Sequence, residues 1–416
     1  MQTETDFDAI IVGGGIGGAA LAFSLAKAGK RILVLEKSMA YKDRVRGEWI
    51  APWGVIEAQT LGLYDVFMAA GGHHVGRHVS YGDEFESPAE AEAAALPLAA
   101  LVPGIAGPLC LQHTVACTTL AAAAATAGAT VLRGVDDIHV TAGVQPVVRY
   151  THRGGEATAS CRLIVGADGR NSVVRGQAGI PIHRGERHHL FSGMLVENAP
   201  GWPEDLQTKG TEGNVNYLAF PQGEGRVRLY LGYDYSQKDL LSGKDAQRRF
   251  LDAFRLSTLP GSEHLANATA VSHCFSYPNE DTWTDEPFVD GLVLVGDAAG
   301  HNDPIIGQGL SITLRDVRMV RDALLLTDVW SDARSLFTEY STERAERMRR
   351  LRFAAEISAV VDSEFGDEAC ERRKAVAKRR ATDPSLMLPT LAVMLGPENA
   401  PAFAFTEEMR AKILTG

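Results

Sequence analysis

The sequence predicts an α/β fold in which a parallel sheet carries an inserted antiparallel sheet and is followed by C-terminal helices. Residues 8–37 (DAIIVGGGIGGAALAFSLAKAGKRILVLEK) read as a buried strand, a glycine turn, a helix and a second buried strand. Residues 184–276 change to short alternating strands joined by Pro and Gly turns. At residues 291–300 (GLVLVGDAAG) the chain returns to a buried strand, so the first domain is expected to be discontinuous.

The remaining elements follow from the same periodicities. Helical patterns occupy residues 52–70, an Ala-rich segment at 112–128 ended by Gly128, and residues 308–326. Strand-like runs occupy 77–83, 130–140, 145–150 and 157–165. We expect one discontinuous domain from residues 1–75, 100–183 and 277–330, a sheet domain from 76–99 and 184–276, and a helical region from 331–416. The basic clusters at 344–352 and 372–380 are interpreted as solvated helix faces because acidic residues lie nearby.

Charge and cysteine content exclude several classes of protein. The chain has 416 residues and a formal net charge of −11, which disfavours nucleic acid as a partner. Five cysteines without a CxxC pair indicate neither a zinc site nor a disulfide framework, and the adjacent pairs His73-His74 and His188-His189 lack further ligands at metal spacing. The acidic N-terminal segment does not read as a signal peptide, so we expect a cytoplasmic protein.

One uncharged stretch, residues 93–132, is long enough on paper to span a membrane. Pro97, Pro103 and Pro108 break its first half, and its second half consists largely of Ala and Thr, which are only weakly apolar. We therefore expect buried core and no integral membrane span.

A dinucleotide-binding turn is the strongest local motif. Gly13-x-Gly15-x-x-Gly18 joins the first strand to its helix, and Glu36 ends the next strand. Gly13 allows a tight turn, Gly15 lets backbone amides approach a pyrophosphate, and Gly18 lets the helix pack on the strand, so that the positive helix end faces the phosphates. Glu36 is suited to accept hydrogen bonds from ribose hydroxyls and disfavours a 2′-phosphate. The alternative is a glycine-rich turn without a ligand.

Three motifs in order resemble one enzyme family. VGGGIGG…LEK, GADGRNSVVR at 166–175 and GLVLVGDAAGHNDPIIGQGLS at 291–311 are similar to class A FAD-dependent monooxygenases, the p-hydroxybenzoate hydroxylase-like flavoprotein hydroxylases. The resemblance covers residues 8 to about 326. It implies a Rossmann-like FAD-binding domain with an inserted antiparallel-sheet substrate domain. It also implies that FAD is bound by the one glycine motif, while NADH or NADPH docks transiently.

The resemblance assigns expected cofactor contacts by position. Gly296 and Asp297 are expected at the ribityl chain, Asp168 near the pyrophosphate, and the segment from Pro304 at the flavin pyrimidine ring, where a positive helix end stabilises negative charge. Arg46, with Gly47 and Glu48, matches the position where family members bring an arginine to FAD, and Gln112 matches another FAD-contacting position; surface charge or a helix cap is the alternative. The complete set is Gly13, Gly15, Ile16, Gly17, Gly18, Glu36, Lys37, Arg46, Gly47, Gln112, Val135, Asp168, Gly296, Asp297, Pro304, Gly307, Gly309 and Leu310.

The implied reaction uses NAD(P)H and O2 to hydroxylate or epoxidise an aromatic or unsaturated small molecule through a flavin hydroperoxide. The flavin then carries the chemistry. The catalytic residues stay unknown, with Arg46, Pro304 and His301 as weak candidates. The substrate is expected between the flavin and the antiparallel sheet, beside Trp49, Trp53, Tyr217, Phe220 and Tyr230, which are otherwise ordinary core residues.

Departures from the family pattern keep other functions open. Gly300 stands where many members have His, His301 follows it, and Ser311 replaces a usual Asn. The GDAAG form with Asp303-Pro304 also resembles geranylgeranyl reductases and flavin-dependent halogenases. A flavin-dependent alkene reductase, an FAD-dependent halogenase and an FAD-binding protein without redox turnover therefore remain alternatives. The sequence leaves the choice between monomer and homodimer open.

Overall fold

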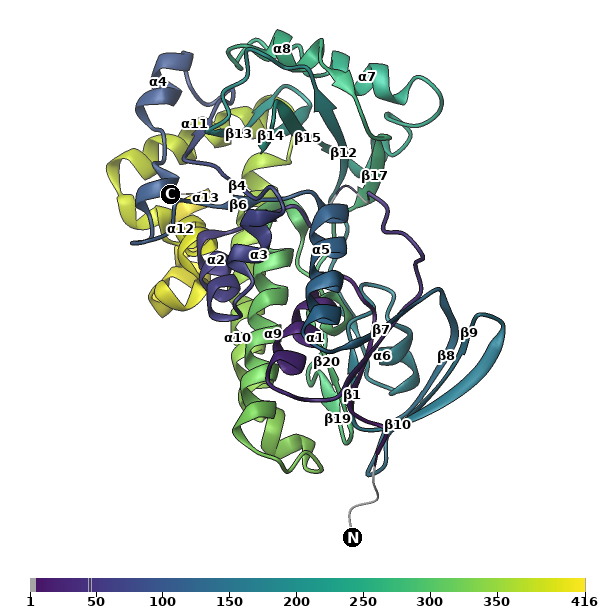
Figure 1. Cartoon of the computed structure of the whole chain (residues 1–416). Coiled ribbons are helices and arrows are strands. Elements are labelled where there is room, and N and C mark those ends of the chain that lie inside the picture. The colour runs from purple at the N-terminus through teal and green to yellow at the C-terminus, as the bar shows by residue number, and fades with distance from the viewer. Residues whose placement is uncertain (1–4, 44, 46, 416) are drawn as a thin grey trace.

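The computed structural model describes residues 5–43, 45 and 47–415. A parallel sheet with its helices, an antiparallel sheet and a group of C-terminal helices lie against one another (Figure 1). The long helix α10 (Ala333–Asp362) runs along the parallel-sheet part and reaches the antiparallel sheet. The predicted fold class is confirmed, whereas the predicted domain limits stay predictions.

The parallel sheet has five strands in the order β20-β10-β1-β2-β7, with β19 (Phe288–Val289) antiparallel at its edge. Its parallel strands are β1 (Phe7–Val12), β2 (Ile32–Glu36), β7 (Thr130–Arg133), β10 (Gly155–Gly166) and β20 (Leu292–Leu294). Successive residues of β1 enter two different cores, so both faces of the sheet are covered.

Three helices cover one face of this sheet, namely α1 (Ile16–Lys27), α5 (His113–Thr126) and α9 (Gly309–Leu326). The other face packs against α6 (Val173–Gln177) and the hairpin of β8 (Val135–Thr141) and β9 (Val147–His152). The uncharged stretch at 93–132 supplies α5 and the short strand β6 (Leu109–Cys110). Among the described residues, no helix combines the length and apolarity needed to cross a membrane.

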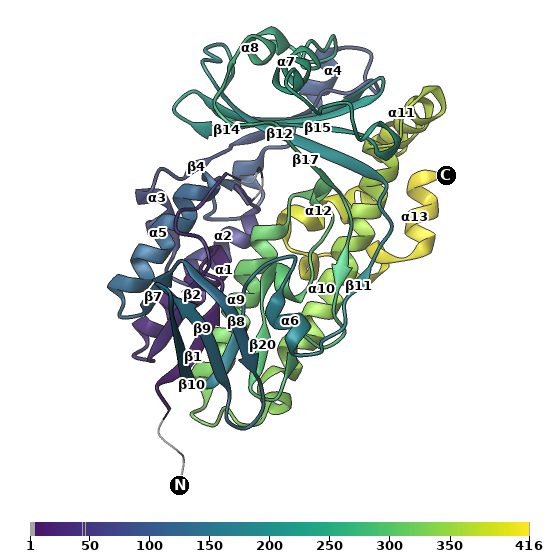
Figure 2. The same ribbon diagram turned by 90° about the vertical axis from the view of Figure 1, so that its right-hand side faces the viewer.

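The antiparallel sheet has the order β16-β12-β15-β14-β13-β5, in which β5 alone runs parallel to its neighbour among the described strands, and β17 also pairs with β12. Its strands are β5 (Arg77–Ser80), β12 (His189–Glu197), β13 (Leu206–Glu212), β14 (Val215–Gly223), β15 (Arg226–Asp234), β16 (Thr269–Ala270) and β17 (Phe275–Pro278). Helices α7 (Ala246–Asp252) and α8 (Ser262–Ala266) cover its outer face, and the inner face looks toward the parallel-sheet domain (Figure 2).

The remaining elements complete the packing. The predicted helix at 52–70 is two helices, α2 (Pro52–Thr60) and α3 (Tyr64–Ala69), because the chain turns at Gly62 with a positive φ of 71°. The C-terminal helices α11 (Asp367–Thr382), α12 (Leu388–Leu395) and α13 (Glu407–Leu414) share a core with α10. Smaller elements are β3 (Trp49–Ile50), β4 (His73–His74), α4 (Pro88–Ala93), β11 (His183–Arg184) and β18 (Thr282–Trp283).

Candidate functional site

The glycine turn after β1 lies at the carboxyl end of the parallel sheet, beside the start of α9. Gly13 has a φ of 102°, which favours glycine. A Cβ on Gly18 would lie 1.9 Å from the Gly13 carbonyl oxygen, and one on Gly17 would lie 2.8 Å from Thr313 Cγ2 of α9. These glycines are therefore required for close packing of α1 against β1 and α9.

Gly15 differs from its neighbours because it faces open space. No atom of the described residues lies within 4 Å of a Cβ built on Gly15, which forms the N-cap of α1. Ile16 begins the helix, and the cap supplies no side chain to the first amides. The amino end of α1 thus offers backbone N–H donors without a side-chain cap, together with a positive helix end, and both suit a phosphate.

Glu36 is buried at the end of β2, beside this turn. Its Oε2 accepts a hydrogen bond from the Gly14 amide and its Oε1 from the Ser38 amide, both at 2.7 Å. Each carboxylate oxygen can accept a further bond, so the residue is compatible with ribose hydroxyls. The side chain of Lys37 is exposed, and Val135 is a buried side chain in β8.

Two side chains near Glu36, one aromatic and one basic, were not predicted from the sequence. The Tyr41 hydroxyl donates to the Gly14 carbonyl, and the Arg133 guanidinium lies 4.2 Å from the centre of the Tyr41 ring. Residue Arg133 is paired with Glu36 in the register of β2 and β7. These two side chains therefore flank the turn on the side where an adenosine is expected.

Asp168 and Asp297 occupy neighbouring loops after β10 and β20. Asp168 Oδ2 accepts from the amides of Val173 and Val174 at 2.7 and 3.1 Å, while Oδ1 is buried without a hydrogen-bond partner among the described residues. Asp297 lies in the short helix η3 (Gly296–Ala299), 3.3 Å from Arg170 Nε. One acceptor and one ion pair thus meet at the edge where the ribityl chain and pyrophosphate are expected.

The amino end of α9 is open as well. The short helix η4 (Pro304–Ile306) leads into it, and a Cβ on Gly307 would lie 3.4 Å from the Trp49 ring. No described atom lies within 4 Å of a Cβ on Gly309, and Leu310 follows in the first turn. The side chain of Gln308, the N-cap residue of α9, is held in place because its Oε1 accepts a hydrogen bond from Trp53 Nε1 at 2.8 Å.

Buried charges from α10 hold these loops from behind. Asp316 of α9 is fully buried, and its Oδ2 accepts from the Gly296 amide at 2.9 Å and from Arg344 Nε at 3.0 Å. Arg347 Nη2 donates to Asp316 Oδ1 at 2.7 Å, and Arg344 also donates to the Gly300 carbonyl. Arg344 and Arg347 are each only 3% exposed, so the interpretation of the 344–352 cluster as a solvated face is wrong for these residues.

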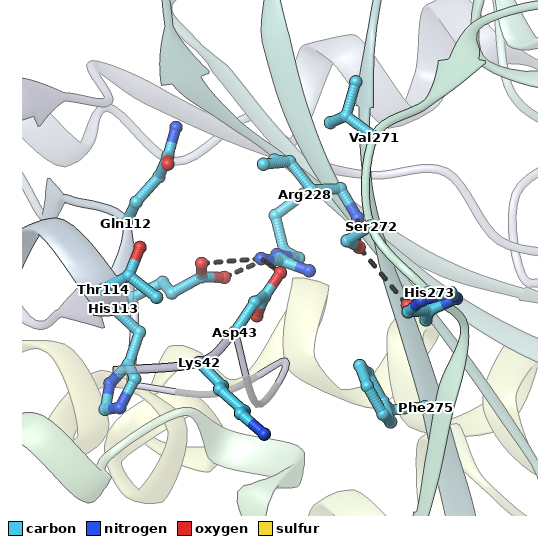
Figure 3. Close-up of a pocket in the computed structure, with 12 residues that line it drawn as sticks. Lys42, Asp43, Gln112, His113, Thr114, Arg228, Val271, Ser272, His273 and Phe275 are labelled. Atoms are coloured by element: carbon cyan, nitrogen blue, oxygen red, sulfur yellow. Dashed lines mark hydrogen bonds and ion pairs between the residues drawn. The ribbon is translucent and has the colours of Figure 1, made fainter. Parts of the chain in front are cut away.

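A cavity of about 470 Å³ lies between the antiparallel sheet and the residues Lys42, Asp43 and Glu48 (Figure 3). Arg228 of β15 is fully buried there, with its Nε 2.5 Å from Glu48 Oε2 and its Nη2 2.9 Å from Asp43 Oδ2. Burial raises the pKa of Glu48, although Arg228 opposes this shift. The lining residues are Lys42, Asp43, Glu48, Gln112, His113, Thr114, Leu195, Arg228, Val271, Ser272, His273 and Phe275.

Two predicted FAD contacts belong to this region. Gln112 is the N-cap of α5 and lines the cavity. Gly47 has a φ of 73°, and a Cβ there would lie 3.0 Å from His113 Nδ1. Arg46 lies outside the described residues. No sequence signal pointed to the Arg228–Glu48 pair, because its members are 180 residues apart.

The predicted substrate residues separate onto two faces. Phe220 and Tyr230 lie on the inner face of the antiparallel sheet with ring centres 5.8 Å apart, in the same apolar cluster as Trp49 and Trp53. The prediction for Tyr217 is wrong, because this residue belongs to the outer core, where its hydroxyl donates to the Tyr81 carbonyl at 2.7 Å. Residues three apart on a strand point to opposite faces.

The hydrogen bonds of these tryptophans define their positions. Trp49 Nε1 donates to Gln207 Oε1 at 2.6 Å, which ties β3 to β13. Trp53 is 1% exposed and Trp49 is 9% exposed. Of the two tryptophans, Trp49 is therefore the better placed to contact a substrate. His301 is also buried, and its Nδ1 lies 2.8 Å from Thr282 Oγ1.

Comparison with known protein families identifies the family of this chain. The model of the family described as "FAD binding domain" matches residues 6–354. The chain belongs to this FAD-binding family. The family and the FAD cofactor expected from the three sequence motifs are thereby confirmed.

A relative of known name is similar to this chain over most of its length. Squalene epoxidase 2, mitochondrial, from Arabidopsis thaliana is 26% identical over 337 residues, which cover 78% of this chain and 55% of the relative. This chain therefore spans little more than half the length of that relative.

Two solved structures share the fold. The p-nitrophenol 4-monooxygenase PnpA from Pseudomonas putida DLL-E4 has a TM-score of 0.78 at 19% identity, covering 94% of this chain and 97% of the other. CmlS, a flavin-dependent halogenase, has a TM-score of 0.73 at 17% identity, covering 99% and 77%.

The residues at the edge of the parallel sheet fit FAD. The amino ends of α1 and α9 both face open space at Gly15 and Gly309, and a buried oxygen of Asp168 retains its acceptor capacity. Side chains at either glycine would fill the approach to these amides. An FAD-binding protein with this sheet can thus place phosphates at one helix end and the electron-accepting ring at the other.

Asp297→Ala is expected to weaken retention of FAD, because it removes a carboxylate that is predicted to lie at the ribityl chain and leaves Arg170 without its ion-pair partner. The readout is the fraction of apo-protein after gel filtration, determined from the ratio of flavin to protein absorbance. Asp322→Asn, a change in an exposed residue of α9, is the control. Equal flavin content in the Asp297 variant and wild type would contradict the ribityl role.

Proposed function

We propose that the protein is an NAD(P)H-dependent flavoprotein monooxygenase that uses O2 to hydroxylate or epoxidise an aromatic or unsaturated small molecule. One observation carries the proposal: the open amino end of α9 faces the same region as the aromatic inner face of the antiparallel sheet. Trp49 links the two, because a Cβ on Gly307 would lie 3.4 Å from its ring and Trp49 shares an apolar cluster with Phe220 and Tyr230. The names of the relatives, a squalene epoxidase and a p-nitrophenol monooxygenase, support this class of reaction.

FAD, when bound, supplies the redox and oxygen-transfer chemistry. The residues that would hold it are the glycine turn of α1 for the pyrophosphate, Glu36 for the adenosine ribose, Asp297 for the ribityl chain, and the segment Gly307–Leu310 for the pyrimidine ring. The positive end of α9 would stabilise negative charge at that ring. Asp316 and Arg344 keep the supporting loops in place.

The inner face of the antiparallel sheet supplies the other side of the proposed substrate site. Phe220, Tyr230 and Trp49 provide apolar and aromatic surface that excludes water. The Tyr230 hydroxyl donates to the Val45 carbonyl at 3.2 Å, so its ring is fixed across the loop that carries Gly47. Exclusion of water protects a reactive oxygen donor from wasteful breakdown.

The test is a screen of phenols, anilines and alkenes for compounds that stimulate NADH or NADPH oxidation by the purified holoprotein. Product formed under ¹⁸O2 is expected to contain one labelled oxygen atom. Product without label, or NAD(P)H that fails to bleach the flavin under anaerobic conditions with every compound, would overturn the proposal. Anaerobic reduction of the alkene would indicate a reductase, and bromide-dependent products a halogenase, the second candidate favoured by the fold of CmlS.

We further propose that the protein works in a reducing compartment and that its partners are small molecules. Among the described residues, Cys110, Cys161, Cys274 and Cys370 form no disulfide, which supports a cytoplasmic protein. The proposed partners are the small-molecule substrate, O2 and NAD(P)H.

Phe220→Leu is expected to uncouple oxygen consumption from product formation, because it removes aromatic surface from the proposed substrate wall. We expect a larger share of the consumed NAD(P)H to appear as hydrogen peroxide. The matched control is Phe254→Leu, since Phe254 packs on the opposite face of the sheet. Equal peroxide yields from the two variants would argue against a substrate wall at Phe220.

A further inference from the structure

A buried polar cluster lies just before the loop that leads into α9. It joins His189 at the start of β12, Asn279 after β17, and Asp303 before η4. His189 is fully buried and Asp303 is 4% exposed. His189 Nε2 lies 2.8 Å from Asn279 Nδ2 and 3.7 Å from Asp303 Oδ1. The cofactor contacts described above do not use this cluster.

The cluster retains unused hydrogen-bonding capacity. Among the described residues, His189 Nδ1, Asn279 Oδ1 and Asn302 Oδ1 are buried without a hydrogen-bond partner. Buried polar atoms are nearly always paired, so unpaired atoms of three neighbouring side chains leave this cluster able to form further hydrogen bonds. His189 is neutral there, because burial lowers its pKa to about 4.

Asp303 is the acidic member of this cluster. Its Oδ1 accepts from the Ile305 amide at 2.9 Å, and its own amide donates to Asp281 Oδ1 at 2.9 Å. Burial raises the pKa of Asp303 to about 7, and the like charge of Asp281 adds to this effect. The Ile305 amide, Asn279 and Arg170 oppose it.

Other charged or titratable groups surround the carboxyl groups of Asp303 and Asp281. His301 precedes Asn302 in the same loop, and His188 acts on His189. Arg352 and Glu356 of α10 act on Asp281 with opposite signs. As a result of these opposing influences, the carboxyl group of Asp303 changes its protonation state near neutral pH.

The position of Asp303 connects it with the flavin. It caps η4, the short helix that leads into the segment Gly307–Leu310, which we have proposed to hold the pyrimidine ring. Reduction gives that ring negative charge, and a second negative charge nearby in a buried site is electrostatically unfavourable. Protonation of the carboxylate removes this repulsion.

We propose that Asp303 takes up one proton when FAD held against Gly307–Leu310 is reduced and releases it when the flavin is reoxidised. Two electrons enter the flavin from the hydride donor or an electrode. The proton comes from bulk water and forms an O–H bond on the carboxyl group. Reoxidation breaks that bond and returns the proton to water. The inference requires FAD in this place but no oxygen transfer, so a failed monooxygenase assay would leave it standing.

The experiment is anaerobic potentiometric titration of the holoprotein as a function of pH. Below about pH 7 Asp303 is already protonated in the oxidised protein, so it adds nothing to the slope. Above that pH it is ionised when the flavin is oxidised and protonated when the flavin is reduced. The midpoint potential should therefore fall with a slope steeper by about 30 mV per pH unit, because one extra proton accompanies two electrons.

Variants assign this slope to Asp303. Asp303→Asn and Asp303→Ser keep an acceptor for the Ile305 amide but cannot ionise, and both should lose the extra slope. Asp383→Asn is the matched control, because Asp383 also precedes a proline and caps a short helix, yet is exposed. It should retain the slope of the wild type.

Equal slopes for wild type and the Asp303 variants would overturn the inference. If both variants fail to keep FAD, proton uptake by the wild type decides. Electrochemical reduction near about pH 8 should take up more than one proton per flavin by indicator dye, since the flavin itself takes one. Uptake of one proton or fewer would overturn the inference.

Discussion

Gly15→Val is expected to abolish FAD binding while leaving the protein folded. The residue has φ −69° and ψ −168°, which valine tolerates, and a Cβ there contacts no described atom within 4 Å. The side chain would instead occupy the approach to the amino end of α1. We expect FAD affinity to fall by more than about 100-fold, or about 2.7 kcal/mol, measured by flavin fluorescence titration of apo-protein.

The neighbouring glycine provides the contrast. Gly18→Ala would place Cβ 1.9 Å from the Gly13 carbonyl oxygen, so this variant is expected to lower the melting temperature of the apo-protein. Gly15→Val is expected to preserve it. A Gly15 variant that keeps its flavin, or that loses flavin only together with its fold, would contradict a phosphate site at this turn.

Asp316→Asn is expected to destabilise the protein strongly, because it leaves Arg344 and Arg347 buried without their shared counter-charge. Breaking a buried ion pair by removing one partner costs about 3–5 kcal/mol, a large share of the roughly 5–15 kcal/mol that stabilises a typical domain. The measurement is urea denaturation followed by tryptophan fluorescence.

An exposed carboxylate on the same helix is the control. Asp322 pairs with Arg318 at 3.1 Å on the surface of α9, and exposed pairs contribute about 0–1 kcal/mol. Asp322→Asn should therefore shift the urea midpoint little. If the two variants prove equally stable, the charge network behind Gly296 and Gly300 has no major structural role.

The parts of the fold that depend on local spacing could be predicted from the sequence. Gly13, Gly15 and Gly18 are close in the chain, and each requirement follows from the geometry of one strand-turn-helix. The return to the parallel sheet near residue 291 was readable because β20 is a short apolar run followed by a glycine turn.

Pairings across the chain could not be predicted in this way. Arg344 and Asp316 lie on different helices, and only their packing shows that the basic cluster is partly buried. The prediction placed Tyr217 on the same face as Phe220, but residues three apart in β14 point to opposite faces, and the packing of the sheet shows that Tyr217 enters the outer core. The Arg228–Glu48 pair likewise depends on contact between two sheets.

The strand order β20-β10-β1 has a consequence for biosynthesis. Strand β1 ends at Val12, yet the sheet beyond its neighbour β10 is completed, and this face covered, only when β20 and α9 are added some 300 residues later. Pairings of such long sequence separation form slowly and leave apolar surface uncovered meanwhile. A nascent chain on the ribosome should therefore be unable to retain the yellow cofactor until α9 has emerged, and translation pauses before that point should promote aggregation.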